Sequence, residues 1–161
     1  MAHNYKTTIV FCEKQPMNDL LYIGQWQGFY TYGPEYGDIV AGKEAEFRLF
    51  IEEYSDSRFT GKCIDWEGIG ANGEVSKVTG FIKGEFISFT KEYPHYYVMD
   101  EWGNSSVEPD LPGHTVVYEG RFDQHLNSFV GTWEIIITIE HRVDSTIEEI
   151  LTGTWRMQRQ V

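Results

Sequence analysis

The sequence has 161 residues, a length typical of one domain that can bury a sizeable hydrophobic core. Its net charge is −12, and its 13 Lys and Arg residues never stand next to one another. Nucleic acid and anionic membrane surfaces are bound by clustered Lys and Arg, so this composition argues against both partners. No stretch approaches the roughly 18 apolar residues that a membrane-spanning helix needs.

The cellular setting is predicted from the N-terminus and the cysteines. The N-terminal residues lack the apolar core and the small-residue cleavage pattern of a signal peptide. Cys12 and Cys63 give neither a CxxC spacing nor a disulfide framework. We therefore expect a cytoplasmic protein with reduced thiols.

Apolar and polar residues alternate with a period of two along most of the chain, which is typical of half-buried strands. Residues 5–13 are a candidate ninth strand, which either joins the sheet or packs across one end. The eight segments with clear alternation are 24–32, 45–54, 57–66, 78–82, 87–93, 116–122, 129–139 and 153–159.

Short turns join several of these strands. Residues 53–57 separate the second strand from the third, and Asn72-Gly73 is typical of a type I′ hairpin turn. Lys83-Gly84 forms another compact turn. Consecutive hairpins make a meander, and closing it buries one face and removes the open edges. The predicted fold is all-β: a single antiparallel meander barrel of about eight strands, over residues 22–160 of a one-domain chain.

An apolar-x-Gly pattern recurs six times within these strands. Because Gly weakens a strand, six in the same phase require a reason. We expect each Gly to face inward and to make room for a neighbouring strand's Trp or Tyr. The glycines are Gly28, Gly61, Gly80, Gly120, Gly131 and Gly153.

Two segments interrupt the alternation and are predicted to ring the barrel mouth. Residues 94–113 hold three of the five prolines, and connections this long are often functional. We expect this segment to begin with a short strand at 95–99 and to continue as a loop over the mouth. Residues 33–42 are the other candidate rim element.

Gly24-Gln25-Trp26 in the first strand resembles the Gly-x-Trp that opens the barrels of the lipocalins and avidins, together called calycins. The resemblance implies that Trp26 packs near the closed end against a basic residue of the last strand, for which Arg159 is the match. It covers most of residues 22–160 in layout but few positions in sequence. It implies an architecture, and no function transfers with it.

Three charged residues are predicted to face inward from three strands: Asp65, Lys91 and Arg159. A buried charge is costly unless it is paired, so these residues form an ion pair, reach water at a rim, or contact a polar or anionic ligand. All three interpretations remain open from the sequence.

Aromatic residues are predicted to line the lumen and the long loop. Such a lining suits a small-molecule pocket and suits a packed core equally well. The aromatic residues of the lumen are Tyr30, Tyr32, Tyr93, Tyr118, Trp133 and Trp155, and those on the loop are Tyr96, Tyr97 and Trp102. From the aromatic and charged residues together we select ten candidate binding residues: Tyr30, Tyr32, Asp65, Lys91, Tyr93, Tyr96, Trp102, Tyr118, Trp133 and Arg159.

Catalytic and metal-binding patterns are weak. No His-x-His or His-x₃-His occurs, although His95 and His114 bracket the long loop and meet in space if that loop folds back. Asp65 and Glu67 would share a face as an acid/base pair if their strand continued that far. No cofactor is indicated.

The leading hypothesis is a non-enzymatic binder of a small molecule in the lumen. The alternatives are a protein-interaction or self-associating barrel with a packed interior, and a small barrel hydrolase or lyase that uses Asp65 and Glu67. Apolar residues on the outward faces suit either a homodimer interface or a surface covered by the N-terminal strand. These residues are Phe29, Phe50, Ile64, Trp66, Phe81, Val130 and Ile136.

Overall fold

A computed structural model describes residues 20–69, 71–141 and 143–160. The candidate ninth strand at residues 5–13 and Cys12 lie outside these ranges, and Cys63 is a free, buried thiol. The elements are β1 (Gly24–Tyr32), η1 (Pro34–Tyr36), α1 (Gly37–Val40), β2 (Glu44–Ser55), β3 (Arg58–Asp65), β4 (Val75–Lys83), β5 (Phe86–Glu92), β6 (Tyr96–Met99), β7 (Ser105–Glu108), β8 (Thr115–Asp123), β9 (Ser128–His141) and β10 (Thr146–Arg159).

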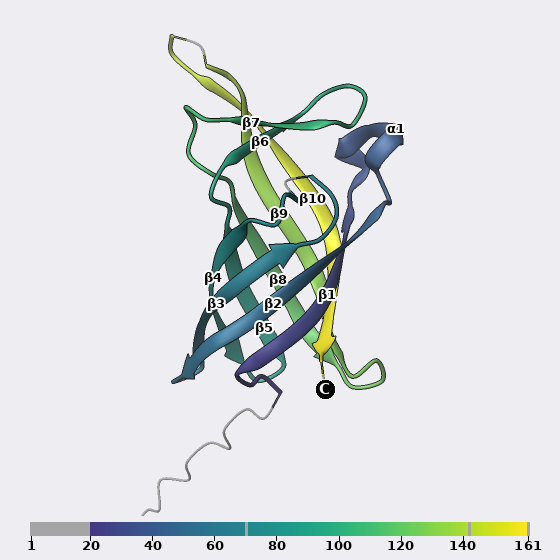
Figure 1. The fold of residues 1–161 in the computed structure, drawn as a ribbon, viewed down its shortest axis with the longest axis vertical. Coiled ribbons are helices and arrows are strands. Elements are labelled where there is room, and N and C mark those ends of the chain that lie inside the picture. The colour runs from purple at the N-terminus through teal and green to yellow at the C-terminus, as the bar shows by residue number, and fades with distance from the viewer. Residues whose placement is uncertain (1–19, 70, 142, 161) are drawn as a thin grey trace, which may run out of the picture.

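Eight of these strands close into an antiparallel barrel in the order β1-β10-β9-β8-β5-β4-β3-β2 (Figure 1). This confirms the predicted fold class, because each of the eight alternating segments coincides with one barrel strand. The hairpin β6-β7 is a separate two-stranded sheet between β5 and β8 in sequence. In the described part of the chain, no helix is long and apolar enough to span a bilayer.

The two ends of the barrel differ (Figure 1). β1 begins at the lower end of the view, near the C-terminus, and ends at the upper end. The hairpin β6-β7 and helix α1 both lie at the upper end, so the two interrupting segments 33–42 and 94–113 do form one rim.

The lower half of the lumen is filled by side chains. Its apolar residues are almost fully excluded from solvent, and rings from neighbouring strands occupy the space beside the inward glycines. A Cβ at Gly28 would overlap the Phe47 ring, and one at Gly120 would come 2.7 Å from the Trp155 ring. The fully buried residues of this half are Leu49, Ile51, Phe59, Ile82, Ile87, Phe129 and Met157.

A large ring therefore lies beside four of the six glycines, but the predicted Trp or Tyr is present at only two of them: Trp155 at Gly120 and Trp133 at Gly153. Gly80 lies against Phe59 and Phe89, and Gly153 lies against the Trp133 ring, as Gly28 and Gly120 lie against theirs. The remaining two, Gly61 and Gly131, instead lie against the backbone of a neighbouring strand.

The closed lower end keeps the predicted Trp26 and Arg159 as directly opposed residues of β1 and β10. Tyr22 lies between them: its ring stacks on Trp26 at 4.7 Å, and the Arg159 guanidinium lies 3.8 Å from the Tyr22 ring centre. Because Arg159 is the last residue of its strand, its side chain leaves the lumen and is exposed.

The connection between β3 and β4 corrects a predicted turn. Asn72-Gly73 is not a two-residue hairpin, because β3 ends at Asp65 and β4 begins only at Val75. A type I′ turn needs a positive φ at both central residues, and only Gly73 has one, at 77°. Residues 66–69 and 71–74 instead belong to a longer connection, called the loop 66–74 below, which reaches the tyrosines of the upper lumen.

The outward-facing apolar residues divide into two groups. Trp66, Phe81 and Ile136 are exposed, whereas Phe29, Phe50, Ile64 and Val130 are half-buried within the outer face. Phe29, for example, is covered by the Arg156 guanidinium, 4.7 Å from the ring centre. Self-association through this face stays a prediction.

Candidate functional site

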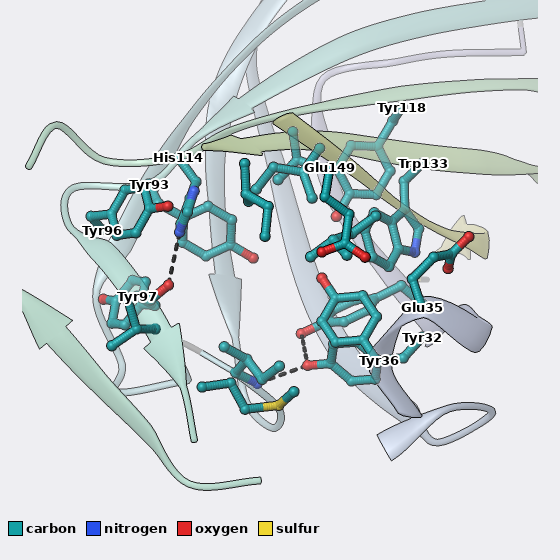
Figure 2. A pocket seen from close by; sticks show the side chains of 18 residues that line it. Tyr32, Glu35, Tyr36, Tyr93, Tyr96, Tyr97, His114, Tyr118, Trp133 and Glu149 are labelled. Atoms are coloured by element: carbon teal, nitrogen blue, oxygen red, sulfur yellow. Dashed lines mark hydrogen bonds between the residues drawn. The ribbon is translucent and has the colours of Figure 1, made fainter. Parts of the chain in front are cut away.

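The upper half of the barrel encloses a cavity of about 390 Å³ (Figure 2). Barrel strands form its walls, while η1, the loop 66–74 and the hairpin β6-β7 form its rim. Its lining residues are Tyr30, Tyr32, Glu35, Tyr36, Ile69, Tyr93, Tyr96, Tyr97, Val98, Met99, His114, Val116, Tyr118, Trp133, Ile135, Ile137, Glu149 and Leu151.

Two tyrosines of β1 are fixed to one wall by a chain of hydrogen bonds. The backbone N–H of Ile69 donates to Tyr32 Oη at 2.7 Å, and the hydroxyls of Tyr32 and Tyr30 are 3.3 Å apart. Tyr30 Oη donates to the carbonyl oxygen of Glu67 at 3.3 Å. Each hydroxyl has one proton, so Tyr32 donates to Tyr30. Every polar group in this series of hydrogen bonds then has a partner.

The loop 66–74 can reach these hydroxyls because it carries a glycine at the point of contact. Gly68 has a φ of 96°, which disfavours a side chain, and a Cβ there would come 2.7 Å from Tyr30 Oη. The two rings are consequently held against the wall and do not fold into the lumen.

A buried ion pair lies behind the wall of the cavity. Lys91 Nζ and Asp65 Oδ1 are 2.5 Å apart, and Tyr93 Oη donates to the other Asp65 oxygen at 2.5 Å. Lys91 is only 1% exposed. Its ammonium also lies 4.5 Å from the centre of the Tyr93 ring, a cation–π distance.

The surroundings of Lys91 favour its charged form. Burial opposes the charged form of Lys91, but the negative Asp65, together with Cys63, Tyr118 and Tyr30, raises its pKa well above the ordinary value. Burial and the same carboxylate raise the pKa of Tyr93, so that hydroxyl keeps its proton. Neither Lys91 nor Asp65 lines the cavity, so a ligand does not meet their charges directly.

The hairpin β6-β7 is tied to the barrel by its own polar contacts. Tyr97 Oη donates to Glu74 at 3.0 Å and accepts from Asn72 Nδ2 at 3.0 Å. His114 Nε2 lies 2.9 Å from the Tyr97 carbonyl oxygen, and the Tyr96 ring lies over the imidazole at 3.9 Å between centres. Burial lowers the pKa of His114 although the hydrogen bond to Tyr97 opposes this, so His114 is neutral at pH 7 and donates from Nε2.

The mouth carries an aromatic and acidic group of residues. The Tyr36 ring lies 4.8 Å from the Tyr32 ring and 6.0 Å from the Trp133 ring, between centres. Burial, the Tyr32 hydroxyl and the carboxylates of Glu35 and Glu149 all raise the pKa of Tyr36. Figure 2 shows the Glu149 carboxylate reaching into the same region of the cavity.

Tyr118 provides a hydrogen-bonding group inside the cavity. Its ring is stacked on Phe89 at 4.6 Å and is 3% exposed. No hydrogen-bond partner for its hydroxyl occurs among the described residues, and Figure 2 shows the hydroxyl directed into the cavity. Because burial raises its pKa, this hydroxyl is protonated and can both donate and accept.

The structure brings six of the ten candidate binding residues to the cavity. Asp65 and Lys91 lie behind its wall, where they form the ion pair that was one of the predicted interpretations. Trp102 is 72% exposed in the turn between β6 and β7, and Arg159 is at the opposite end of the barrel, so neither lines the cavity. The six that do line it are Tyr30, Tyr32, Tyr93, Tyr96, Tyr118 and Trp133.

Several lining residues were missed in the candidate list for identifiable reasons. Tyr36 and Glu35 belong to η1, where no alternation marks a side chain as inward. Tyr97 and His114 bound the loop segment and were not assigned an orientation. Glu149 could have been found, because the alternation of the last strand extends back from Gly153 through Leu151 to Glu149.

The proposed acid/base pair does not form. β3 ends at Asp65, so Glu67 lies in the loop and is exposed, while Asp65 is held by Lys91 and Tyr93. Burial raises the pKa of Cys63 to about 12, so its thiol stays protonated and is a poor nucleophile. Among the described residues, no three His, Cys, Asp or Glu side chains are grouped to hold a metal, and His95 instead contacts Glu74 at 3.1 Å.

Comparisons with known proteins place the chain by shape alone. No protein-family model and no curated protein sequence matches it. Among solved structures, it resembles shwanavidin, with 15% identity over 80% of this chain and 92% of that chain and a TM-score of 0.42. Rhizavidin gives 15% identity over 84% of each chain and a TM-score of 0.43. A redesigned β-barrel gives 18% identity over 88% of this chain and 93% of that chain, with a TM-score of 0.44. These are likenesses of barrel shape alone.

Proposed function

We propose that this protein binds a small molecule in the cavity at the upper end of its barrel, without catalysing a reaction. The observation that carries the proposal is a cavity of about 390 Å³ whose aromatic walls are held in place by hydrogen bonds. Inside it lies the Tyr118 hydroxyl, which has no hydrogen-bond partner among the described residues. This volume falls in the range of small-molecule pockets, which are mostly apolar with a few placed polar groups.

The way the walls are built supports binding over packing. Asp65 holds the Tyr93 hydroxyl from behind the cavity wall. The hydroxyls of Tyr32 and Tyr97 are held by the rim loop between β3 and β4, so all three rings line the space without filling it. A barrel with a packed interior would have the lumen filled in both halves. The absence of an assembled acid/base pair among the described residues favours binding over hydrolysis or elimination.

Location and partners follow from the same reasoning. The free thiol of Cys63 suits the reducing cytoplasm, which we propose as the location. The ligand is expected to enter between η1 and the hairpin β6-β7, which flank the mouth.

The test is recovery of a ligand from the purified full-length protein by native mass spectrometry, followed by solvent extraction. Leu151→Trp places an indole in the cavity, whereas Ile150→Trp is the matched control, because Ile150 is 53% exposed on the outer face. We expect a bound mass in the wild type and in Ile150→Trp but not in Leu151→Trp. A bound mass of equal abundance in all three would locate the ligand elsewhere and refute the proposal.

Tyr118→Phe tests the proposed anchor. Removing one hydroxyl that bonds to the ligand is expected to weaken binding by about three- to tenfold. The fold should be unaffected, because the hydroxyl has no partner among the described residues. Unchanged affinity would show that the ligand does not use Tyr118.

A further inference from the structure

The charged residues that line the cavity are all acidic in the described part of the chain. Glu35 and Glu149 contribute carboxylates at the mouth, and no Lys or Arg is among the lining residues. The one basic side chain among the described lining residues is His114, and it is neutral at pH 7. The whole chain adds a net charge of −12. The potential in this cavity is therefore negative, which favours cations and opposes anions.

Aromatic rings surround the same region of the mouth. Tyr32, Tyr36 and Trp133 lie within 6.3 Å of one another, measured between ring centres. The indole N–H of Trp133 donates to the Thr31 carbonyl oxygen at 3.0 Å, so it is not available to a ligand. Besides the hydroxyls of Tyr36 and Tyr118, what remains toward the cavity is the carbon surface of the rings and the acceptor oxygens of the carboxylates. Both attract a positive charge.

The nearest buried cation does not change this balance. Lys91 is paired with Asp65 and separated from the cavity by Tyr93 and Tyr30, so its charge is already neutralised. Arg159, which was also expected to orient a ligand, lies at the opposite end of the barrel. An anionic ligand would thus find no positive partner among the described lining residues.

We propose that the cavity selects a cationic amine, with an apolar body between the walls near Tyr118 and an ammonium group at the mouth beside Glu149, Tyr36 and Trp133. This inference rests on the proposed binding function and specifies its ligand class. The half-buried carboxylate of Glu149 supplies the charge, and the rings supply a cation–π surface of the kind used in aromatic cages.

The experiment uses three probes that share a phenyl ring and a three-carbon chain and differ in charge: 3-phenylpropylammonium, 3-phenylpropan-1-ol and 3-phenylpropanoate. Their dissociation constants are measured by calorimetry at pH 7 on the full-length protein. We expect the ammonium to bind at least about fivefold more tightly than the alcohol. The carboxylate should bind more weakly than the alcohol.

A matched pair of variants tests the site of the charge. Glu149→Gln removes the lining carboxylate, and Glu148→Gln makes the same change of net charge at the adjacent exposed position. We expect Glu149→Gln to weaken ammonium binding by about five- to tenfold and to leave alcohol binding unchanged. Glu148→Gln should change neither.

The outcomes separate this inference from the proposed function. Equal binding of ammonium and alcohol, tighter binding of the carboxylate, or equal effects of Glu149→Gln and Glu148→Gln would overturn the cation preference and leave the cavity as a binding site. If none of the probes binds, a neutral or anionic ligand recovered from the wild type but not from Leu151→Trp overturns the inference alone. Absence of both probe binding and a recovered ligand overturns the inference together with the proposed function.

Discussion

Both halves of the lumen are lined by aromatic side chains, but the lower half is filled and the upper half contains a cavity. In the lower half, Phe47 and Trp155 fill the space that Gly28 and Gly120 leave open. In the upper half, aromatic residues are equally frequent, but about 390 Å³ stays empty. The difference lies in the polar tip. A Phe ring packs wherever there is room, whereas a Tyr hydroxyl with a partner behind the wall keeps its ring at the wall.

The ion pair of Lys91 and Asp65 links the halves, because Lys91 Nζ lies near both Tyr30 of the cavity and Phe47 of the filled region, 5.9 and 6.0 Å from the ring centres. Changing Lys91 to Met leaves a buried, unpaired carboxylate. We expect this to lower the free energy of unfolding by about 3–5 kcal/mol at pH 7, measured by urea denaturation.

The double variant Lys91→Met/Asp65→Leu is the control for this prediction. With both charges gone, most of the lost stability should return. A loss below about 1 kcal/mol in Lys91→Met would show that water reaches Asp65, so that the wall between the pair and the cavity is open.

Paired truncations compare the packing of the two halves. Ile87 is 0% exposed in the lower half, and Ile135 borders the cavity in the upper half. We expect Ile87→Ala to cost about 3–4 kcal/mol of unfolding free energy, because it creates a new void. Ile135→Ala should cost about half as much, since part of its surface already faces empty space. Equal losses, measured by the same denaturation, would indicate that the upper half is packed in solution.

Acid is expected to act on the upper half alone. The folded protein lowers the pKa of His114, so the folded state binds protons less readily than the unfolded chain. The corresponding stability is present above about pH 6.5, the ordinary pKa of His, and is lost as the pH falls below it. Protection factors of β6 amides against hydrogen exchange should drop by up to about tenfold between pH 7.5 and 5.5. In the variant His114→Gln, the protection factors of the β6 amides should not change between these two pH values. A similar drop in that variant would show that a group other than His114 causes it.

The sequence predicted the barrel well because inside and outside alternate residue by residue. Tyr30, Tyr118 and Trp133 were assigned to the lumen by that alternation, and the structure places all three there. Alternation gives the face of a strand but no depth along the barrel. Arg159 was therefore expected in the lumen, although the strand ends there and its side chain lies outside.

Whether the lumen is open depends on contacts between distant parts of the chain. Tyr32 stays at the wall because the backbone N–H of Ile69, in the connection between β3 and β4, donates to its hydroxyl. Tyr93 stays there because Asp65 accepts a hydrogen bond from its hydroxyl. Neither partner is marked by a local pattern, and the Asn72-Gly73 pair suggested a short hairpin in place of this loop. From the sequence, the pocket could therefore be proposed as one hypothesis, but it could not be distinguished from a packed core.

The central claim is that one barrel holds a filled half and a ligand-binding half. A ¹H–¹⁵N NMR titration of the full-length protein with 3-phenylpropylammonium tests it most directly, because every assigned amide reports its own surroundings. We predict saturable shift changes around Tyr30, Tyr118 and Trp133, with none around Phe59 and Ile87 at the other end. Changes confined to the outer faces, or spread evenly over both halves, would contradict the account.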